Sequence, residues 1–184
     1  MWRGWCLLLA CLSAGVFADE TVRVCHGYGC EFQVRIRYSE GQLGQIRRMM
    51  LAATDAATER GVLAVTIGRL YGWAGEQSDI HNDRGGNYAD DNVSGKMDCI
   101  DHSTSTTRLL QLLTRRGYLR WHRVLEPEAR NFAGILPVHW SAVVEEKNDG
   151  EPRRFAVDSW FVDNGQPAVI LRLEEWKKGA GPDV

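Results

Sequence analysis

The sequence predicts an α+β fold in which a cysteine-bearing helix packs on an antiparallel sheet, with an added strand and a long helix before it. Apolar residues recur at helical spacing over residues 43–71 and again over 100–113. Apolar segments of strand length then follow one another after residue 117. An order of strand, helix, loop, helix and then consecutive strands is typical of the α+β class.

Residues 1–18 have the features of a secretory signal peptide. Arg3 is the only charge, an apolar run extends from Trp5 to Leu12, and small residues precede a cleavage site after Ala18. The apolar run is shorter than the roughly 20 residues that a membrane-spanning helix needs. We therefore expect a periplasmic or secreted protein with no membrane span.

A lipid anchor is the alternative interpretation of this segment. The sequence LLAC, which ends at Cys11, loosely resembles a lipoprotein cleavage box, but the apolar run before it is short. Cleavage after Ala18 leaves residues 19–184 as a single domain that is large enough to bury a core. Removing Arg3 takes the formal net charge from −2 to −3, and a mildly acidic chain lacks the basic footprint of a nucleic-acid-binding protein.

The cysteines that follow the signal segment predict one disulfide and one free thiol. Cys25 and Cys30 flank a turn with two glycines, CHGYGC, so a local bridge between them is geometrically plausible. An odd count in an oxidising compartment leaves Cys99 unpaired. A lone cysteine is also often a small buried apolar residue, which is the structural alternative.

Periodicity predicts the elements of the first two thirds in chain order. Alternation in EFQVRIRYS, residues 31–39, indicates a half-buried strand, and residues 43–71 indicate one long or kinked amphipathic helix. Residues 76–97 are rich in Gly, Asn and Asp and predict a long solvated loop. A second helix is expected over residues 100–116, ending at Gly117.

Strands are predicted for the last third of the chain. The candidates GYLRWHRVL, VHWSAVVEE and RRFAVDSWFV occupy residues 117–125, 138–146 and 153–162. A turn over residues 147–152 joins the last two of them into a hairpin. The segment AVILRLEEW, residues 168–176, is expected to add an edge strand before a polar tail.

Cys99 is the candidate nucleophile. It lies where the second predicted helix begins, and free backbone N–H groups at a helix start favour a thiolate and an oxyanion. Asp98 and Asp101 oppose this, because neighbouring carboxylates disfavour a thiolate. The two carboxylates must therefore be turned away from the sulfur or balanced by a cation.

His139 and Asp158 are the candidate partners of this thiol. His102 shares a helix face with Cys99 but lies one turn deeper, whereas His139 can face the helix start from a strand. The two hairpin registers considered pair Asp158 with His139 or with Ser141, and both put His139 and Asp158 on one face. From there the carboxylate can orient the imidazole and stabilise its charged form.

This arrangement resembles the transglutaminase-like (papain-like) cysteine-enzyme superfamily. The resemblance rests on Cys99 opening a helix, on His139 beginning a strand and on Asp158 within the next strand, and it covers residues 95–163. It implies that Cys99 is the nucleophile, His139 the general base and acid, and Asp158 the orienting carboxylate. Several segments are also similar to uncharacterised exported bacterial proteins: VCHGYGC, ATERG, GKMDCIDHSTST, HWSAVV and VDSWF.

The function that the resemblance implies is acyl transfer through a thioester. The protein would be a peptidase, an amidase or a transglutaminase-like enzyme, and its partner a peptide or amide substrate such as a cell-envelope protein or peptidoglycan. No cofactor is expected. Asp98 departs from the superfamily, which often has an aromatic or hydrophobic residue before the cysteine. Trp140, Trp160 and Asn92 are candidates for a second oxyanion donor by vicinity alone.

Two other classes of protein compete with the enzyme. A non-catalytic periplasmic binding or assembly protein could use the same scaffold, with tryptophans as its ligand surface. A metal site is the other alternative, and it would use Cys99, His102, His139 and Asp158, whose sulfur and imidazole donors suit zinc. The closely paired ligand spacing of zinc sites is missing, so the metal site ranks last.

Overall fold

The protein has an α+β fold, as the sequence predicts. The computed structural model describes residues 18–86, 90, 92–131 and 138–182. Two antiparallel sheets are present in this part of the chain, one made of β1 (Glu20–His26) and β2 (Phe32–Tyr38), the other of β3 (His122–Arg130), β4 (His139–Glu146), β5 (Arg154–Asp158) and β6 (Val169–Arg172). The helical elements are α1 (Glu40–Leu51), α2 (Ala56–Gly75), the short 3-10 helix η1 (Asp79–Asn82), α3 (Cys99–Arg115) and α4 (Leu173–Lys177).

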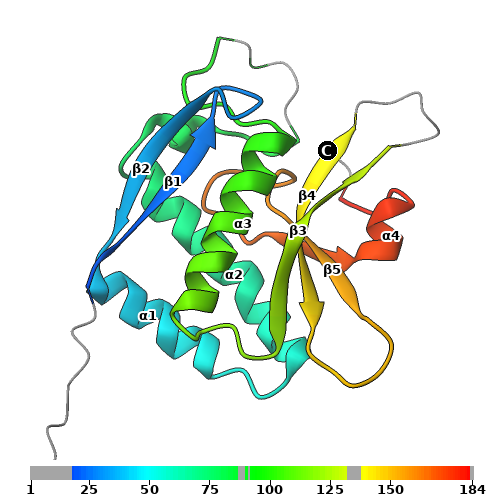
Figure 1. The fold of residues 1–184 in the computed structure, drawn as a ribbon. Coiled ribbons are helices and arrows are strands. Elements are labelled where there is room, and N and C mark those ends of the chain that lie inside the picture. The colour runs from blue at the N-terminus through cyan, green and yellow to red at the C-terminus, as the bar shows by residue number, and fades with distance from the viewer. Residues whose placement is uncertain (1–17, 87–89, 91, 132–137, 183–184) are drawn as a thin grey trace, which may run out of the picture.

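Helix α3 lies between the two sheets, and α4 covers the other face of the larger sheet (Figure 1). The main core joins α1, α2, α3 and the β1–β2 hairpin to one face of β4 and β5, where Ala142 and Val144 point. A second apolar cluster lies on the opposite face and contains Val143 and Trp176. Strand β4 is therefore buried on both faces, which accounts for the uninterrupted apolar run Ala142, Val143 and Val144 at its centre.

The N-terminal region contains a strand that the sequence did not predict. Strand β2 is present as expected, but it pairs with β1 as a separate two-stranded sheet and does not join the larger one. Val22 and Val24 of β1 are buried against the main core, and their alternation with polar residues suits a strand of a half-buried hairpin. Cys25 and Cys30 form a disulfide at the hairpin turn, which confirms the predicted bridge.

The predicted long helix is interrupted. Residues 43–71 are largely helical, but α1 ends at Leu51 and α2 begins at Ala56. The helix is broken at Asp55, which has an extended backbone and caps α2. Its carboxylate accepts a hydrogen bond from the Thr58 N–H, and the Thr58 hydroxyl accepts one from the Asp55 N–H. Such a capping box favours a new helix start over continuation of the preceding helix.

The strands of the last third differ from their predicted limits. Strand β3 begins at His122, because the backbone N–H groups of Arg120 and Trp121 bind the buried Glu59 carboxylate and take no part in strand pairing. The edge strand predicted over residues 168–176 is shorter than expected. It ends at Arg172 and is followed by α4.

The hairpin register agrees with one of the two registers considered. Ala142 lies opposite Val157, and continuing this pairing by one residue sets Asp158 opposite Ser141. His139 and Asp158 therefore share a face of the sheet, as predicted.

The predicted signal peptide, residues 1–18, falls outside the described residues apart from Ala18. In the part of the chain that the structure describes, no helix has both the length and the apolar composition of a membrane span.

Candidate active site

Cys99 is the first residue of α3 and is half-buried. Its sulfur lies 3.6 Å from the carbonyl oxygen of Val138, the residue that precedes β4. The start of α3 and the start of β4 are therefore in contact. Cys99 is the free cysteine of the described residues, in agreement with the predicted pairing of the other two.

His139 and Asp158 meet beside this thiol. His139 is the first residue of β4 and Asp158 the last of β5, and the imidazole Nε2 lies 2.7 Å from the Asp158 Oδ2. Cys99 lies near enough to His139 to raise the pKa of its ring. Since Nε2 is held by the carboxylate, Nδ1 is the nitrogen left for the sulfur. The structure thus brings together all three predicted site residues.

The environment of His139 favours its charged form. Burial lowers the pKa of His139, but hydrogen bonds to Asp158 and Cys99, and the negative charge of both groups, together raise it to about 9. A histidine with such a pKa is an imidazolium at neutral pH. The Asp158 carboxylate is almost fully buried, and its contact with Nε2 holds the His139 ring in position.

Aromatic side chains enclose the His139 ring. The ring centroids of Trp160, Phe161 and Trp176 lie 4.9, 5.5 and 5.6 Å from that of His139. The indole N–H of Trp176 donates to the same Asp158 oxygen over 2.8 Å, and the backbone N–H of Trp160 donates to the other oxygen over 3.2 Å. Sequence reasoning missed Trp176, because its position next to Asp158 depends on how α4 folds back over the sheet.

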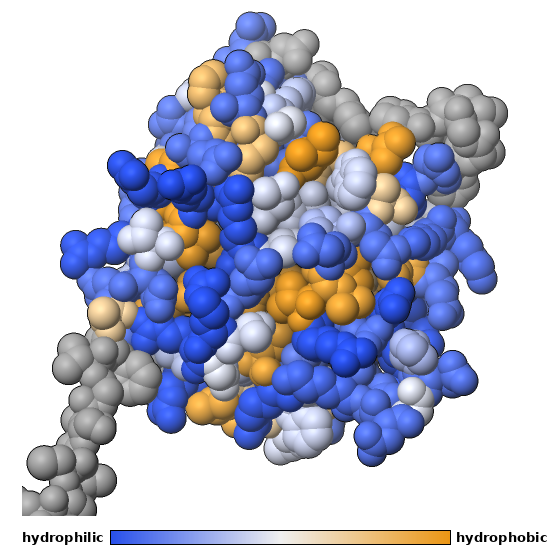
Figure 2. Space-filling view, in the orientation of Figure 1, coloured by the Kyte–Doolittle hydropathy of each residue, from blue (hydrophilic) through white to orange (hydrophobic). Residues whose placement is uncertain are grey.

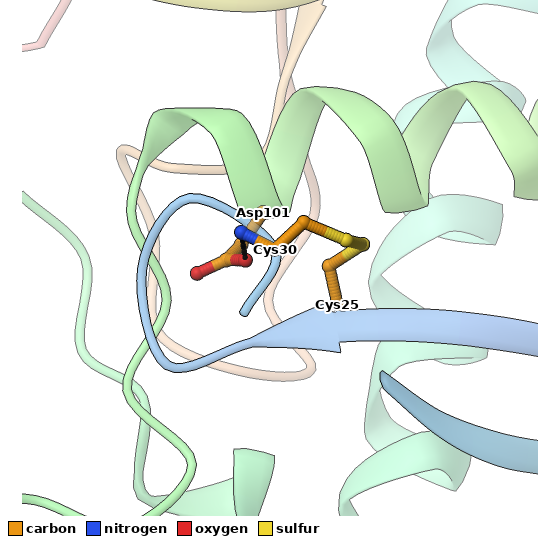
Figure 3. Close-up of side chains that lie close together, drawn as sticks. All are labelled: Cys25, Cys30 and Asp101. Carbon is orange, nitrogen blue, oxygen red and sulfur yellow. Dashed lines mark hydrogen bonds between the residues drawn. A yellow bond between two sulfur atoms is a disulfide. The ribbon is translucent and has the colours of Figure 1, made fainter. Parts of the chain in front are cut away.

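The carboxylates beside Cys99 are engaged by the disulfide loop. Gly27, Tyr28, Gly29 and Cys30 all have positive φ, a run of left-handed conformations that turns successive backbone N–H groups toward the start of α3. The N–H groups of Tyr28 and Cys30 donate to Asp101, each over 2.8 Å, and Figure 3 shows the contact from Cys30 next to the disulfide.

Asp98 is held in the same way. One of its oxygens accepts from the Gly29 N–H over 2.9 Å, and the other caps the helix by accepting from the N–H groups of Ile100 and Asp101. Both carboxylates therefore have backbone donors. These bonds hold both carboxylates toward the disulfide loop.

The charge state of Asp101 reflects the same surroundings. Burial raises the pKa of Asp101 to about 6, and the nearby Asp98 charge also raises it, against the backbone N–H donors of Asp98, Cys30 and Tyr28 that lower it. Asp101 is therefore mostly a carboxylate at neutral pH and depends on the disulfide loop for its hydrogen bonds.

Capping by Asp98 leaves one backbone donor at the start of α3. Among the described residues, the N–H of Cys99 itself has no acceptor, whereas those of Ile100 and Asp101 bind Asp98. Several amides of the helix start were expected to be free for an oxyanion, and only the Cys99 N–H is free among the described residues. Of the three predicted second donors, Trp160 lies against the His139 ring, and Trp140 and Asn92 are at least partly exposed.

His102 belongs to a separate buried network. Its Nε2 lies 3.0 Å from the Asp83 carboxylate and its Nδ1 lies 2.9 Å from the Ser159 hydroxyl, which also bonds with Thr106. The network ties α3 to the residue that follows Asp158, so it supports the site without entering it. Asp83 was missed because it belongs to the segment predicted as a solvated loop, yet it is 1% exposed.

The structure does not assemble the alternative metal site. Both ring nitrogens of His102 are bound elsewhere, away from Cys99 and His139. Within the described residues, the cluster with three potential ligand atoms close together consists of Cys25, Cys30 and Asp101. The two sulfurs of that cluster are joined in the disulfide and are not thiolate ligands.

Comparison of the chain with protein-family models, curated proteins and solved structures gave no match.

The disulfide is expected to stabilise both the fold and this site. Replacing Cys25 and Cys30 together with alanine should lower the free energy of unfolding by about 2 kcal/mol, because the bridge restricts a short loop of the unfolded chain. Urea denaturation measures the change. Cys99→Ala, which leaves the bridge intact, is the matched control and should cost less than about 1 kcal/mol. A double variant as stable as the wild type would contradict a structural role for the bridge.

Proposed function

We propose that the protein is an exported thiol-dependent acyl-transfer enzyme with a transglutaminase-like core, a peptidase, amidase or transglutaminase-like enzyme that uses Cys99, His139 and Asp158. The observation that carries this proposal is the 2.7 Å contact between His139 Nε2 and Asp158, close to the Cys99 thiol. A cysteine, an imidazole and an orienting carboxylate in this order are the groups that nucleophilic thiol catalysis needs.

The first half-reaction forms a thioester. The Cys99 thiolate attacks the carbonyl carbon of a peptide or amide, and the oxyanion that forms is stabilised by the Cys99 backbone N–H. The His139 imidazolium gives its proton to the departing amine nitrogen as the C–N bond breaks. The acyl group is then bound to sulfur, and His139 is neutral.

The second half-reaction releases the acyl group. Neutral His139 takes a proton from water, or from an acceptor amine, as that nucleophile attacks the thioester carbonyl. Breaking of the C–S bond restores the Cys99 thiolate, and His139 is again an imidazolium. Asp158 holds the ring in place in both steps and stabilises its charge, with support from the Trp176 and Trp160 N–H groups.

An exported location is part of this proposal. The Cys25–Cys30 disulfide is typical of proteins in an oxidising compartment, and it supports the interpretation of residues 1–18 as a signal peptide. Cell-envelope proteins and peptidoglycan are the peptide and amide substrates that such a location offers.

The proposed chemistry can be tested by trapping the intermediate. We expect intact-protein mass spectrometry, after brief incubation with a panel of peptide and peptidoglycan-fragment donors and acid quenching, to show a mass increase that maps to Cys99. The adduct should be removed by hydroxylamine, as a thioester is, and should be absent in Cys99→Ser under the same quench. If Cys99 forms no adduct with any donor and its thiol is no more reactive than that of a small-molecule thiol, the binding or assembly protein becomes the better interpretation.

A further inference from the structure

A groove runs beside the candidate nucleophile, between α3 and the strands β3 and β4. It has a volume of about 360 Å³ and is lined by six residues: Ile100, Ser103, Thr104, Glu126, Pro127 and Trp140. Its volume lies in the range of small-ligand sites, which begins at roughly 300 Å³. In Figure 2, apolar and weakly polar side chains lie between the start of α3 and these strands, among hydrophilic surroundings.

The groove is built from the direct neighbours of the candidate catalytic residues. Ile100 follows Cys99 in the chain and Trp140 follows His139, so the groove is lined by neighbours of both residues, although neither Cys99 nor His139 lines it. Trp140 is on the face of β4 opposite to His139, because neighbouring strand residues point to opposite faces. Ser103 lies one helical turn after Cys99 on the same face of α3, so a substrate with its carbonyl at Cys99 can reach the groove along the helix.

The chemistry of the groove is apolar on one side and acidic on the other. Ile100 and Trp140 are large apolar side chains that remain 40% and 37% exposed. Exposed apolar side chains that lie together often mark a binding surface. Glu126 is exposed as well and forms no ion pair with the described residues, whereas its neighbour Glu128 pairs with Lys177. The groove thus combines an apolar wall with an available negative charge.

A bulge in β3 sets the acidic side of the groove. The pairing of β3 with β4 shifts between Leu125 and Glu128, so Glu126 and Pro127 lie outside the regular ladder. Proline has no N–H to donate to the ladder, and β3 is an edge strand where this is tolerated. Bulges of this kind re-aim side chains and are enriched next to active sites.

We propose that this groove is the binding site for the substrate side chain on the acyl side of the scissile bond, and that it takes an aromatic or large aliphatic residue preceded by a basic one. The inference rests on the proposed function, since it needs Cys99 to attack the substrate carbonyl. It adds a substrate class to that function: peptides in which a bulky apolar residue precedes the bond that is cleaved, with a positive charge facing Glu126.

Dipeptidyl chloromethyl ketones test the proposal, because the Cys99 sulfur displaces chloride only after the side chains of the reagent are seated. The three reagents are Arg-Phe, Gln-Phe and Gln-Ala chloromethyl ketones, and each rate is divided by the rate of the same variant with iodoacetamide, which has no side chain. We expect Gln-Phe to react about 10- to 100-fold faster than Gln-Ala, from burial of the phenyl ring. Arg-Phe should exceed Gln-Phe by about two- to fivefold, as expected for an exposed ion pair.

Matched variants assign these preferences to the groove. Trp140→Ala, and Thr104→Phe, which fills the groove from α3, should each reduce the Phe preference to below about threefold. Trp121→Ala is the control for Trp140, because both tryptophans are 37% exposed but Trp121 lies outside the groove, and it should keep the full preference. Glu126→Gln should remove the Arg preference, whereas Glu151→Gln, in the exposed hairpin turn, should keep it.

The possible failures are distinguishable. Equal normalised rates for Gln-Phe and Gln-Ala, or a Phe preference that survives both Trp140→Ala and Thr104→Phe, would overturn the groove assignment and leave the thiol chemistry standing. An iodoacetamide rate that equals that of a small-molecule thiol and does not depend on His139 would overturn the proposed function, while the side-chain preference would still report on the groove.

Discussion

His139→Ala should lower the rate at which iodoacetamide labels Cys99 at pH 7 by roughly tenfold or more, because a neighbouring cation favours the thiolate and the variant removes it. Acyl transfer should fall further, by about 100- to 10,000-fold, since His139 is also the proton donor to the leaving amine. Peptide mapping after timed labelling measures the first effect, and turnover of a donor found by thioester trapping measures the second.

The pH dependence follows from the raised pKa of His139. Burial lowers this pKa, but contacts with Asp158 and Cys99 raise it to about 9, so the imidazolium persists through neutral pH and is lost as the pH rises through about 9. The labelling rates of wild type and His139→Ala should therefore converge above that pH, where neither protein has the cation. Acyl transfer by the wild type should decline over the same interval, because neutral His139 has no proton for the leaving group.

An equivalent change at another histidine separates this effect from a general loss of charge. His81 lies in η1, is exposed and contacts the Ser78 carbonyl, so His81→Ala should label at the wild-type rate. A His139→Ala protein that is folded by circular dichroism and labels as fast as the wild type at pH 7 would show that His139 does not activate Cys99.

The positions of Cys99, His139 and Asp158 could be predicted because they depend on local sequence pattern and on the alternation of side chains along strands. The start of α3 at Cys99 follows from helical periodicity, and the shared face of His139 and Asp158 follows from alternation in a hairpin with a tight turn. Neither inference needs knowledge of how distant segments pack. The Cys25–Cys30 bridge was predictable for the same reason, since its two residues flank one short turn.

The groups that surround the site could not be predicted because they come from distant parts of the chain. Trp176 reaches Asp158 from α4, in a segment whose apolar pattern suits a strand as well as a helix. The sequence pattern around Asp83 predicts a solvated loop, and only the folded chain shows that this carboxylate is buried against His102. The hydrogen bond from Gly29 to Asp98 comes from the disulfide loop about seventy residues earlier, a contact that no local pattern encodes.

Glu59 holds the larger sheet against the rest of the fold at the C-terminal end of α3, the end away from Cys99. This carboxylate is fully buried in the first turn of α2 and accepts hydrogen bonds from the N–H groups of Arg120 and Trp121 and from His122 Nδ1, over 2.7, 2.9 and 2.8 Å. Two of those donors belong to the connection between α3 and β3 and the third is the first residue of β3, so a single carboxylate fixes where β3 begins.

Glu59→Ala should therefore lower the free energy of unfolding by about 3–5 kcal/mol, because the buried groups that bind the carboxylate lose their charged partner. Burial raises the pKa of Glu59, but the hydrogen bonds from His122 and the two backbone N–H groups outweigh it and the pKa is lowered from 4.5. A lowered carboxyl pKa means that this stabilisation is present above about pH 4.5 and is lost as the pH falls through the folded-state value. Urea denaturation of wild type and variant between pH 3 and pH 7 should show their difference shrinking on the acid side.

Glu76→Ala at the other end of α2 is the matched control, because Glu76 is exposed and its loss should change the unfolding free energy by less than about 0.5 kcal/mol. Glu59→Gln keeps the shape but points an amide N–H₂ at donors, so it should recover only part of the loss. If Glu59→Ala is nearly as stable as Glu76→Ala at pH 7, the connection between α3 and β3 is fixed by apolar packing alone, and the Cys99 helix does not depend on this carboxylate for its place beside His139.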